Sequence, residues 1–237
     1  MFHSLTRFVT NRSRIVSHVL LALIAVAAYW LTGLYVPHGS VEYKLTIGMG
    51  YLSLLLIGVT LSIGTLNLWL LHRRRRNPVN IMLRRDTGIW AAFTGIIHVI
   101  FGLMINARGD ILSNFRRWTE DGYELLLNRR GLSNWVGVAA TLVLVLLLLT
   151  SNTLMLRKLR GPRWKLLQRL NYALIGLVLI HTFVYQDISR REAPFETAVI
   201  IGTLFVIVVQ AAGVILTRLR SIKTLRGRAT VRAHTGD

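Results

Sequence analysis

The chain has 237 residues, of which 53% are hydrophobic, and its formal net charge is +19 at pH 7. A mean hydropathy of +0.49, with the apolar residues in long uninterrupted runs, excludes a water-soluble domain. The absence of cysteine excludes CxxCH haem attachment, a thiolate haem ligand and cysteine-bound iron–sulfur clusters, and no GxGxxG or GxxxxGK sequence indicates a nucleotide-binding domain.

Six apolar runs are long enough, or nearly so, for an α-helix that crosses a hydrocarbon core of about 30 Å. In chain order they cover residues 15–35, 47–71, 87–107, 135–155, 170–185 and 197–216. The fifth run is short, so we expect its polar flanks to extend the helix. The runs lack the alternation of a barrel strand. The sequence therefore predicts an all-α integral membrane protein, a single bundle of six transmembrane helices, with a basic tail over residues 217–237.

Basic residues are distributed unevenly among the segments that connect these runs. Six spans place both termini on one side of the membrane, and 21 of the 29 Lys and Arg residues, including Arg73–Arg76, then fall on that side. Because positively charged segments stay in the cytoplasm, we predict cytoplasmic termini and a location in the inner (plasma) membrane of the cell. Membrane lipids with anionic head groups are the expected partners of this charge, rather than nucleic acid. A docking surface for an acidic partner is the alternative.

The longest connection on the opposite side of the membrane covers residues 108–134. Its apolar residues Ile111, Phe115 and Trp118 are three or four positions apart, which favours a short helix lying on the membrane surface. Such a helix would also be placed to cover a cofactor or to meet an electron acceptor.

Two of the seven histidines are expected deep in the membrane. His98 lies 12 residues beyond Asp86 in the third run, and His181 lies 12 residues beyond Arg169 in the fifth. Both helices are expected to run outward, so both imidazoles lie about 18 Å from the inner boundary at about 1.5 Å per residue. Two imidazoles at one depth can bind a metal from opposite sides, as a six-coordinate haem iron requires. The alternative is that each histidine only forms a hydrogen bond with a neighbouring carbonyl.

The stretches around these histidines resemble the ferric reductase-like transmembrane domain family. A basic pair and a glycine precede an apolar run and a histidine in RRDTGIWAAFTGIIHVIFG, residues 84–102. A Thr-Ser pair, a basic linker, a tryptophan and a histidine-bearing span follow one another in TSNTLMLRKLRGPRWKLLQRLNYALIGLVLIHTFVY, residues 150–185. The family includes NADPH oxidases, the metalloreductases called STEAP and the haem subunit of bacterial methionine sulfoxide reductase systems. The resemblance implies a b-type haem with His98 and His181 as its axial ligands.

The resemblance also implies the number of haems. Members with two haems carry a second histidine on each helix, 13 or 14 residues nearer the inside, where this chain has Arg84 and Gln168. Neither side chain replaces an imidazole, so we expect one haem, toward the outer face. Relatives bridge the distance from the donor to the haem with a flavin or a quinone. Together with these two positions, Arg85 and Arg169 are candidates for binding such a group, because arginine forms charge-assisted hydrogen bonds with phosphate.

Two functions remain open on the sequence. The first is a membrane-bound cytochrome b, an oxidoreductase component of the ferric reductase-like class, which carries electrons from a cytoplasmic or membrane donor to an outer-face acceptor. The second is a non-catalytic membrane subunit of a larger respiratory or photosynthetic complex, with or without a retained haem. A visible spectrum decides whether haem is bound, and capture of a partner decides between catalysis and scaffolding.

Overall fold

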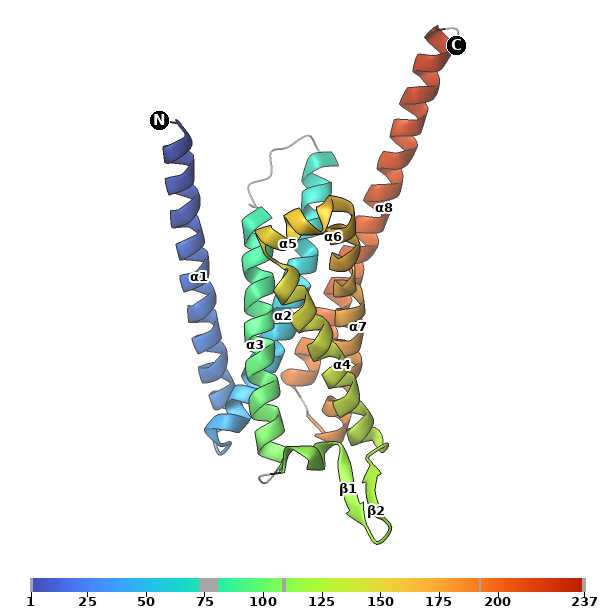
Figure 1. Ribbon diagram of the computed structural model, residues 1–237. Helices are drawn as coiled ribbons and strands as arrows, with labels where there is room; N and C mark the ends of the chain where they lie inside the picture. The colour runs from blue at the N-terminus through green and yellow to red at the C-terminus, as the bar shows by residue number, and fades with distance from the viewer. Residues whose placement is uncertain (1, 73–80, 108–109, 192, 236–237) are drawn as a thin grey trace.

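The computed structural model describes residues 2–72, 81–107, 110–191 and 193–235 and is mostly helical (Figure 1). Within these ranges, six helices are long and apolar enough to cross a membrane. They are α1 (Phe2–Tyr35), α2 (Val41–His72), α3 (Ile81–Ala107), α4 (Arg129–Thr150), α7 (Leu170–Ile188) and α8 (Phe195–Thr235). The predicted all-α bundle of six spans is therefore confirmed.

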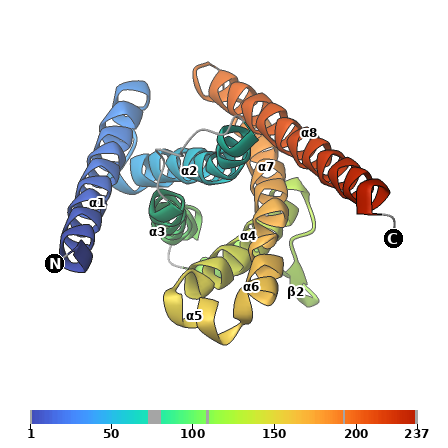
Figure 2. The same ribbon diagram turned by 90° about the horizontal axis from the view of Figure 1, so that it is seen from above.

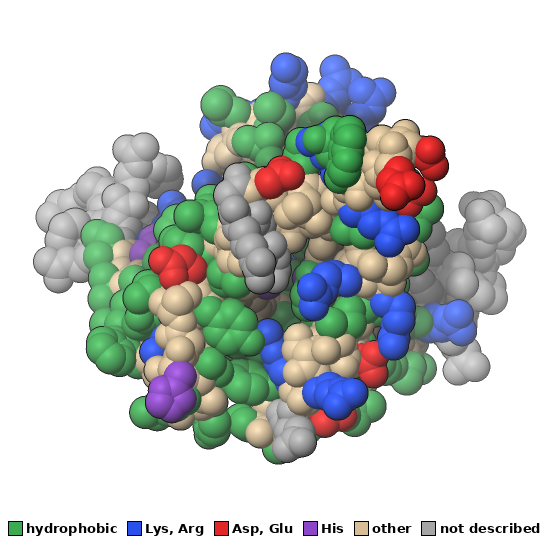
Figure 3. Space-filling model, turned by 90° about the horizontal axis from the view of Figure 1, so that it is seen from below, with side chains coloured by type: hydrophobic (Ala, Val, Ile, Leu, Met, Phe, Trp, Pro, Cys, Tyr) green, Lys and Arg blue, Asp and Glu red, His purple; other side chains and the backbone are tan. Residues whose placement is uncertain are grey.

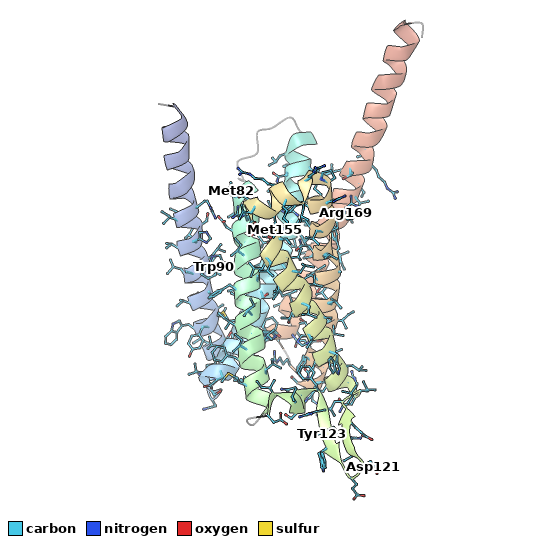
Figure 4. All side chains as sticks on the ribbon, viewed as in Figure 1. Met82, Trp90, Asp121, Tyr123, Met155 and Arg169 are labelled. Atoms are coloured by element: carbon cyan, nitrogen blue, oxygen red, sulfur yellow. The ribbon has the colours of Figure 1, made fainter. Side chains whose placement is uncertain are left out.

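The bundle has two different ends. Both chain termini lie at one end, together with the short helices α5 (Thr153–Lys158) and α6 (Arg160–Gln168). We call this end the terminal face, and we call the opposite end, which carries a β-hairpin, the hairpin face. Figure 4 shows Met155 and Arg169 at the terminal face and Asp121 at the tip of the hairpin.

The centre of the bundle is formed by α2, α3, α4 and α7, and α1 and α8 flank it (Figure 2). α2 packs along both α3 and α8, and α4 packs along α7. α2 and α4 begin at the hairpin face, whereas α3 and α7 end there, so each pair is antiparallel. The first turns of α2 and α4 therefore lie beside the last turns of α3 and α7.

A cluster of buried leucine, isoleucine and alanine side chains joins the central helices from the middle of the bundle toward the terminal face. Its members on the central helices are Leu52, Leu56, Ile57, Leu61, Ala91, Ala92, Ala140, Leu144, Leu147, Leu174 and Ile175. Small residues allow close packing here: a Cβ added to Gly95 would lie 2.8 Å from the Cδ2 of Leu144. This half of the bundle is held by interlocking apolar side chains.

A group of polar side chains joins α1 to α3. Arg14 on α1 donates a hydrogen bond of 3.1 Å to the buried carboxylate of Asp86, and the Nε2 of His18 lies 3.7 Å from the same oxygen. Trp90 lies on α3 near α1 (Figure 4), and its indole N–H donates to the Nδ1 of His18 at 2.9 Å. An ion pair and a hydrogen bond therefore supplement the apolar contacts of this flanking helix.

The predicted surface helix in the loop at the hairpin face is wrong. The described part of the loop contains one 3₁₀ turn, η1 (Ile111–Asn114), followed by the antiparallel strands β1 (Arg116–Thr119) and β2 (Gly122–Leu125). Gly122 has φ +116°, a conformation that residues with a Cβ avoid. The Asp-Gly pair at residues 121–122, where the turn meets β2, is a hairpin signal that outweighs the helical spacing. Trp118 and Tyr123 face each other across the strands, with ring centroids 4.8 Å apart.

Some helix ends also differ from the expected limits. α4 ends at Thr150, not at residue 155, because Asn152 begins α5 by accepting a hydrogen bond from the backbone N–H of Met155. The indole of Trp164 on α6 donates to the carbonyl of Thr150, one of the groups that a helix end leaves unpaired. The sixth span and the expected basic tail form one helix, α8. The arginine run at residues 73–76 lies outside the described residues.

Candidate functional site

A cavity of about 470 Å³ lies between the four central helices in the half of the bundle nearer the hairpin face. His98 from α3 and His181 from α7 both line it. Leu54, Ile57 and Leu144 form part of its wall toward the buried apolar cluster. The structure therefore brings together the two histidines that the sequence places at one depth.

The two imidazoles lie close to each other in the lining of this cavity. Their ring centroids are 6.1 Å apart, and the ring planes are inclined at 87°. The ring of Tyr185 packs beside that of His181, with the two ring centroids 4.9 Å apart.

Each imidazole is fixed by a backbone carbonyl of the neighbouring antiparallel helix. The Nδ1 of His98 lies 2.7 Å from the carbonyl oxygen of Thr46 on α2, and the Nδ1 of His181 lies 2.8 Å from that of Ser133 on α4. A carbonyl oxygen can only accept, so Nδ1 carries the proton in both rings. The Nε2 of each ring is therefore left with its lone pair available to a metal.

A glycine makes room for each of these hydrogen bonds. Gly50 lies four residues after Thr46, and Gly137 lies four residues after Ser133, so each glycine is one helical turn beyond the accepting carbonyl. A Cβ added at Gly50 would lie 2.6 Å from the Nδ1 of His98, and one at Gly137 would lie 3.0 Å from that of His181. The same arrangement thus occurs twice, once for each histidine.

The cavity is polar at the end near the hairpin face and apolar elsewhere. Its polar lining residues at that end include Tyr43, Arg130, Asn134, Tyr185, Ser189 and Arg191. Figure 3, which views this face, shows basic and acidic side chains side by side. A ligand in the cavity would therefore meet apolar side chains inside the bundle and hydrogen-bond donors at its outer edge.

The four other candidate residues lie apart from this cavity. Arg84, Arg85, Gln168 and Arg169 are all described, and the cavity lining includes none of them. The guanidinium of Arg84 lies against Gly64 of α2, and Gln168 accepts a hydrogen bond from Asn171. Arg169 is exposed at the terminal face (Figure 4). The structure thus separates the two histidines from the positions that would hold a second group.

Sequence reasoning missed the residues that support the imidazoles. A signal was present, because TIGMG at residues 46–50 and SNWVG at residues 133–137 both place a hydroxyl residue four positions before a glycine. Each pattern stands near the start of a span that is antiparallel to a histidine-bearing helix. Its meaning depends on which helices are neighbours, which the sequence does not state.

Fold and site together define a multi-pass, all-helical membrane protein with a cavity built around two intramembrane histidines. The family model described as ferric reductase like transmembrane component matches residues 48–179, more than half of the chain, and the chain belongs to this family. The resemblance seen in the sequence is confirmed. The family makes the protein a membrane component of electron-transferring oxidoreductases. The match includes His98 and ends two residues before His181.

Proposed function

We propose that the protein is a b-type haem protein that carries electrons across a membrane through one haem, with His98 and His181 as axial ligands. The observation that carries this proposal is the separation of 6.1 Å between the two ring centroids. A metal–imidazole bond is about 2 Å long and a ring centre lies about 1 Å from its nitrogens, so two rings on opposite sides of one metal have centroids about 6 Å apart.

The surroundings of the rings also suit this role. Histidine ligands donate their second N–H to a carbonyl or carboxylate, which fixes the tautomer and makes the ligating nitrogen more basic. The carbonyls of Thr46 and Ser133 accept these bonds. A volume of about 470 Å³ is within the range of about 300–1,000 Å³ typical of cofactor and ligand sites.

The small number of protein ligands favours haem over a bare metal ion. Among the residues that the structure describes, no group of three or more His, Cys, Asp or Glu side chains is arranged to bind a metal. Two facing imidazoles supply only the axial ligands of a six-coordinate metal. A metal held here therefore needs equatorial ligands of its own, which a porphyrin provides.

When bound, the haem supplies a one-electron carrier that alternates between ferric and ferrous iron. The residues of the chain hold it in place: the two histidines fix the metal, their carbonyl partners hold the ring orientation, and apolar residues such as Leu54 and Leu174 exclude water from its inner side. We propose one haem per chain, because leucine and alanine side chains fill the bundle toward the terminal face.

The direction of electron flow follows from the proposed orientation. With the terminal face in the cytoplasm and the chain in the inner membrane, His98 lies about 18 Å beyond Asp86 along α3. We propose a donor at the terminal face, either cytoplasmic or in the membrane, and an acceptor or a larger membrane complex at the hairpin face. The chain is then an oxidoreductase component that needs a separate donor.

A flavin or a quinone near the terminal face is the proposed link between donor and haem. Arg85 and Gln168 support this, since each has a buried side-chain nitrogen, Nε and Nε2 respectively, that lacks a hydrogen-bond partner among the described residues. Arg84, which precedes Arg85 in the chain, is partly buried, and Arg169 is exposed to an approaching phosphate. Buried polar groups of this kind find partners in ligands or water.

The test is the visible spectrum and the haem content of the purified protein. We expect a low-spin b-type spectrum in the oxidised and dithionite-reduced states, and a pyridine haemochrome assay should give one haem b per chain. The protein is prepared with and without added haem precursor. This comparison distinguishes a protein that cannot bind haem from one that was made when haem was scarce. A colourless protein after haem supplementation contradicts the proposal, and two haems per chain contradict the assigned ligands.

A further inference from the structure

Two arginines line the polar end of the cavity. Arg130 lies in the first turn of α4, and Arg191 follows the end of α7. Arg191 is close enough to His98 and Tyr185 to interact with both electrostatically, and Arg130 is close enough to Tyr185. Both positive charges therefore act on the space between the histidines and the hairpin face.

The surrounding contacts hold Arg191 at the cavity. Its guanidinium donates a hydrogen bond of 3.4 Å to the hydroxyl of Tyr51, which also accepts one from the amide of Gln186. Its backbone N–H donates to the carbonyl of Gln186 at 3.1 Å. Tyr51 also lines the cavity. A side chain held by a neutral hydroxyl keeps most of its donors available to an anion.

Neighbouring arginines on the same face differ in being paired. Arg129 forms an ion pair with Asp187, and Arg117 forms one with Glu124. Among the described residues, neither Arg130 nor Arg191 has a carboxylate within ion-pair distance. The N-terminus of α4 adds its partial positive charge beside Arg130. Among the described residues that line the cavity, the charged ones are Arg130 and Arg191, both at this edge, and the walls elsewhere are mostly apolar.

We infer that Arg130 and Arg191 bind the carboxylates along one edge of the ligand of this cavity, which are the two propionates of the haem. The inference rests on the proposed function. The propionate edge then points to the hairpin face, and the apolar edge of the macrocycle packs toward Leu54, Leu144 and Leu174. Arginine suits this role because its planar guanidinium donates two parallel hydrogen bonds to one carboxylate.

This placement has an electronic consequence. Two fixed cations at the haem edge stabilise the additional electron of the ferrous state, since the attraction between opposite charges is stronger away from bulk water. They therefore raise the midpoint potential relative to a site without them. Arg130 and Arg191 are positioning residues, and their loss should change the affinity and the potential while the axial ligands stay in place.

The experiment compares Arg130→Gln, Arg191→Gln and the double variant with Arg129→Gln, which makes the same substitution at the adjacent, ion-paired residue. The first readout is the rate at which haem passes from the purified protein to an excess of a soluble haem-binding apoprotein. We expect each cavity variant to lose haem about 10-fold faster than the control. The second readout is the midpoint potential, which should fall in all three cavity variants and remain unchanged in Arg129→Gln.

A chemically modified haem identifies the group that the arginines contact. Haem dimethyl ester has no free carboxylates, so the parent protein should bind it more weakly than haem, whereas the double variant should bind the two alike. A double variant that still prefers haem, or that loses haem at the rate of Arg129→Gln, overturns the inference while the bis-histidine spectrum remains. A parent protein that binds no haem overturns both this inference and the proposed function.

Discussion

The two halves of the helical bundle are built from the same four central helices and differ in what lies between them. In the hollow half, which is the half near the hairpin face, the helices enclose a cavity with two histidines. In the filled half, which is the half near the terminal face, leucines and alanines of the same helices pack against one another. The antiparallel packing of α2 with α3 and of α4 with α7 continues through both halves.

The hollow half combines histidines with the space around them. The hollow half has a glycine beside each imidazole: a methyl group at Gly50 would collide with the ring of His98, and one at Gly137 would make a tight contact with the ring of His181. At Gly95, which lies where the cavity meets the packed cluster, the Cδ2 of Leu144 and the Oγ of Ser53 occupy the space that a Cβ would need. Two positions without side chains therefore shape the site, in addition to the two histidines.

The largest effect is expected from removing a ligand in the hollow half. His98→Ala or His181→Ala should abolish the b-type spectrum, because a single imidazole leaves the iron without its second axial ligand. Absorbance of the purified variants measures this. His18→Ala is the matched control: its ring bonds with Trp90 and lies near Asp86, away from the cavity lining, so the spectrum should persist. A full low-spin spectrum in His181→Ala would show that the ligands are misassigned.

A smaller effect is expected from filling the space beside the rings. Gly50→Ala should weaken haem binding by roughly 10- to 100-fold, since overpacking a rigid site costs about 1–3 kcal/mol. Gly137→Ala should have less effect, because its added Cβ would lie 3.0 Å rather than 2.6 Å from the imidazole. Haem titration of the apoprotein gives both affinities.

The control for this pair is Gly176→Ala on α7. A Cβ there would meet no atom within 4 Å, so haem affinity should be unchanged. If all three alanine variants bind haem equally well, the glycines do not shape the site, and the contrast between the two halves has another cause.

An effect on stability alone is expected in the filled half. Asp86→Asn removes the charge that Arg14 binds, and the thermal unfolding midpoint in detergent should fall by about 2–8 °C, for a loss of about 1–2 kcal/mol at a pair in which the carboxylate is buried and the arginine is partly exposed. The haem spectrum should be retained. Asp121→Asn, at the exposed tip of the hairpin, should change neither property. A loss of haem in Asp86→Asn would show that the two halves are coupled.

No gain is expected from adding ligands to the filled half. The double variant Arg84→His, Gln168→His restores histidines at the positions where two-haem relatives carry them, but Leu61, Leu147 and Leu174 belong to the packed cluster there. The pyridine haemochrome assay should still give one haem per chain. Two haems per chain would show that the packed cluster opens readily to admit a ligand.

The sequence predicted the membrane spans from their hydropathy, and it predicted the candidate site from the positions of two histidines. Long apolar runs determine the spans because an unpaired backbone in lipid is too costly for other structures. The depths of His98 and His181 follow from counting residues along regular helices. The hairpin was missed because the spacing of Ile111, Phe115 and Trp118 fits a helix as well as a loop. Gly122, with φ +116°, has a conformation that fits a turn and does not fit a helix.

Long-range contacts explain what the sequence could not provide. Thr46 is 52 residues from His98, and Ser133 is 48 residues from His181, so each hydrogen bond depends on how two helices pack. The positions of Arg130 and Arg191 at the cavity depend on helix packing in the same way. Arg129 and Arg130 are adjacent and chemically identical, and only the packed structure shows that the first binds Asp187 while the second lines the cavity.

The hydrogen bonds from the imidazoles to the backbone also affect how the protein matures. A slip of one residue between antiparallel helices moves the accepting carbonyl by about 1.5 Å along the axis and turns it by about 100° around it. If α2 is shifted by one residue relative to α3, a residue with a side chain lies beside His98 in place of Gly50. Under the proposed function, haem capture therefore depends on helices that have inserted in the correct register. The red colour of membranes that contain the protein would measure the fraction of chains whose helices have assembled in register.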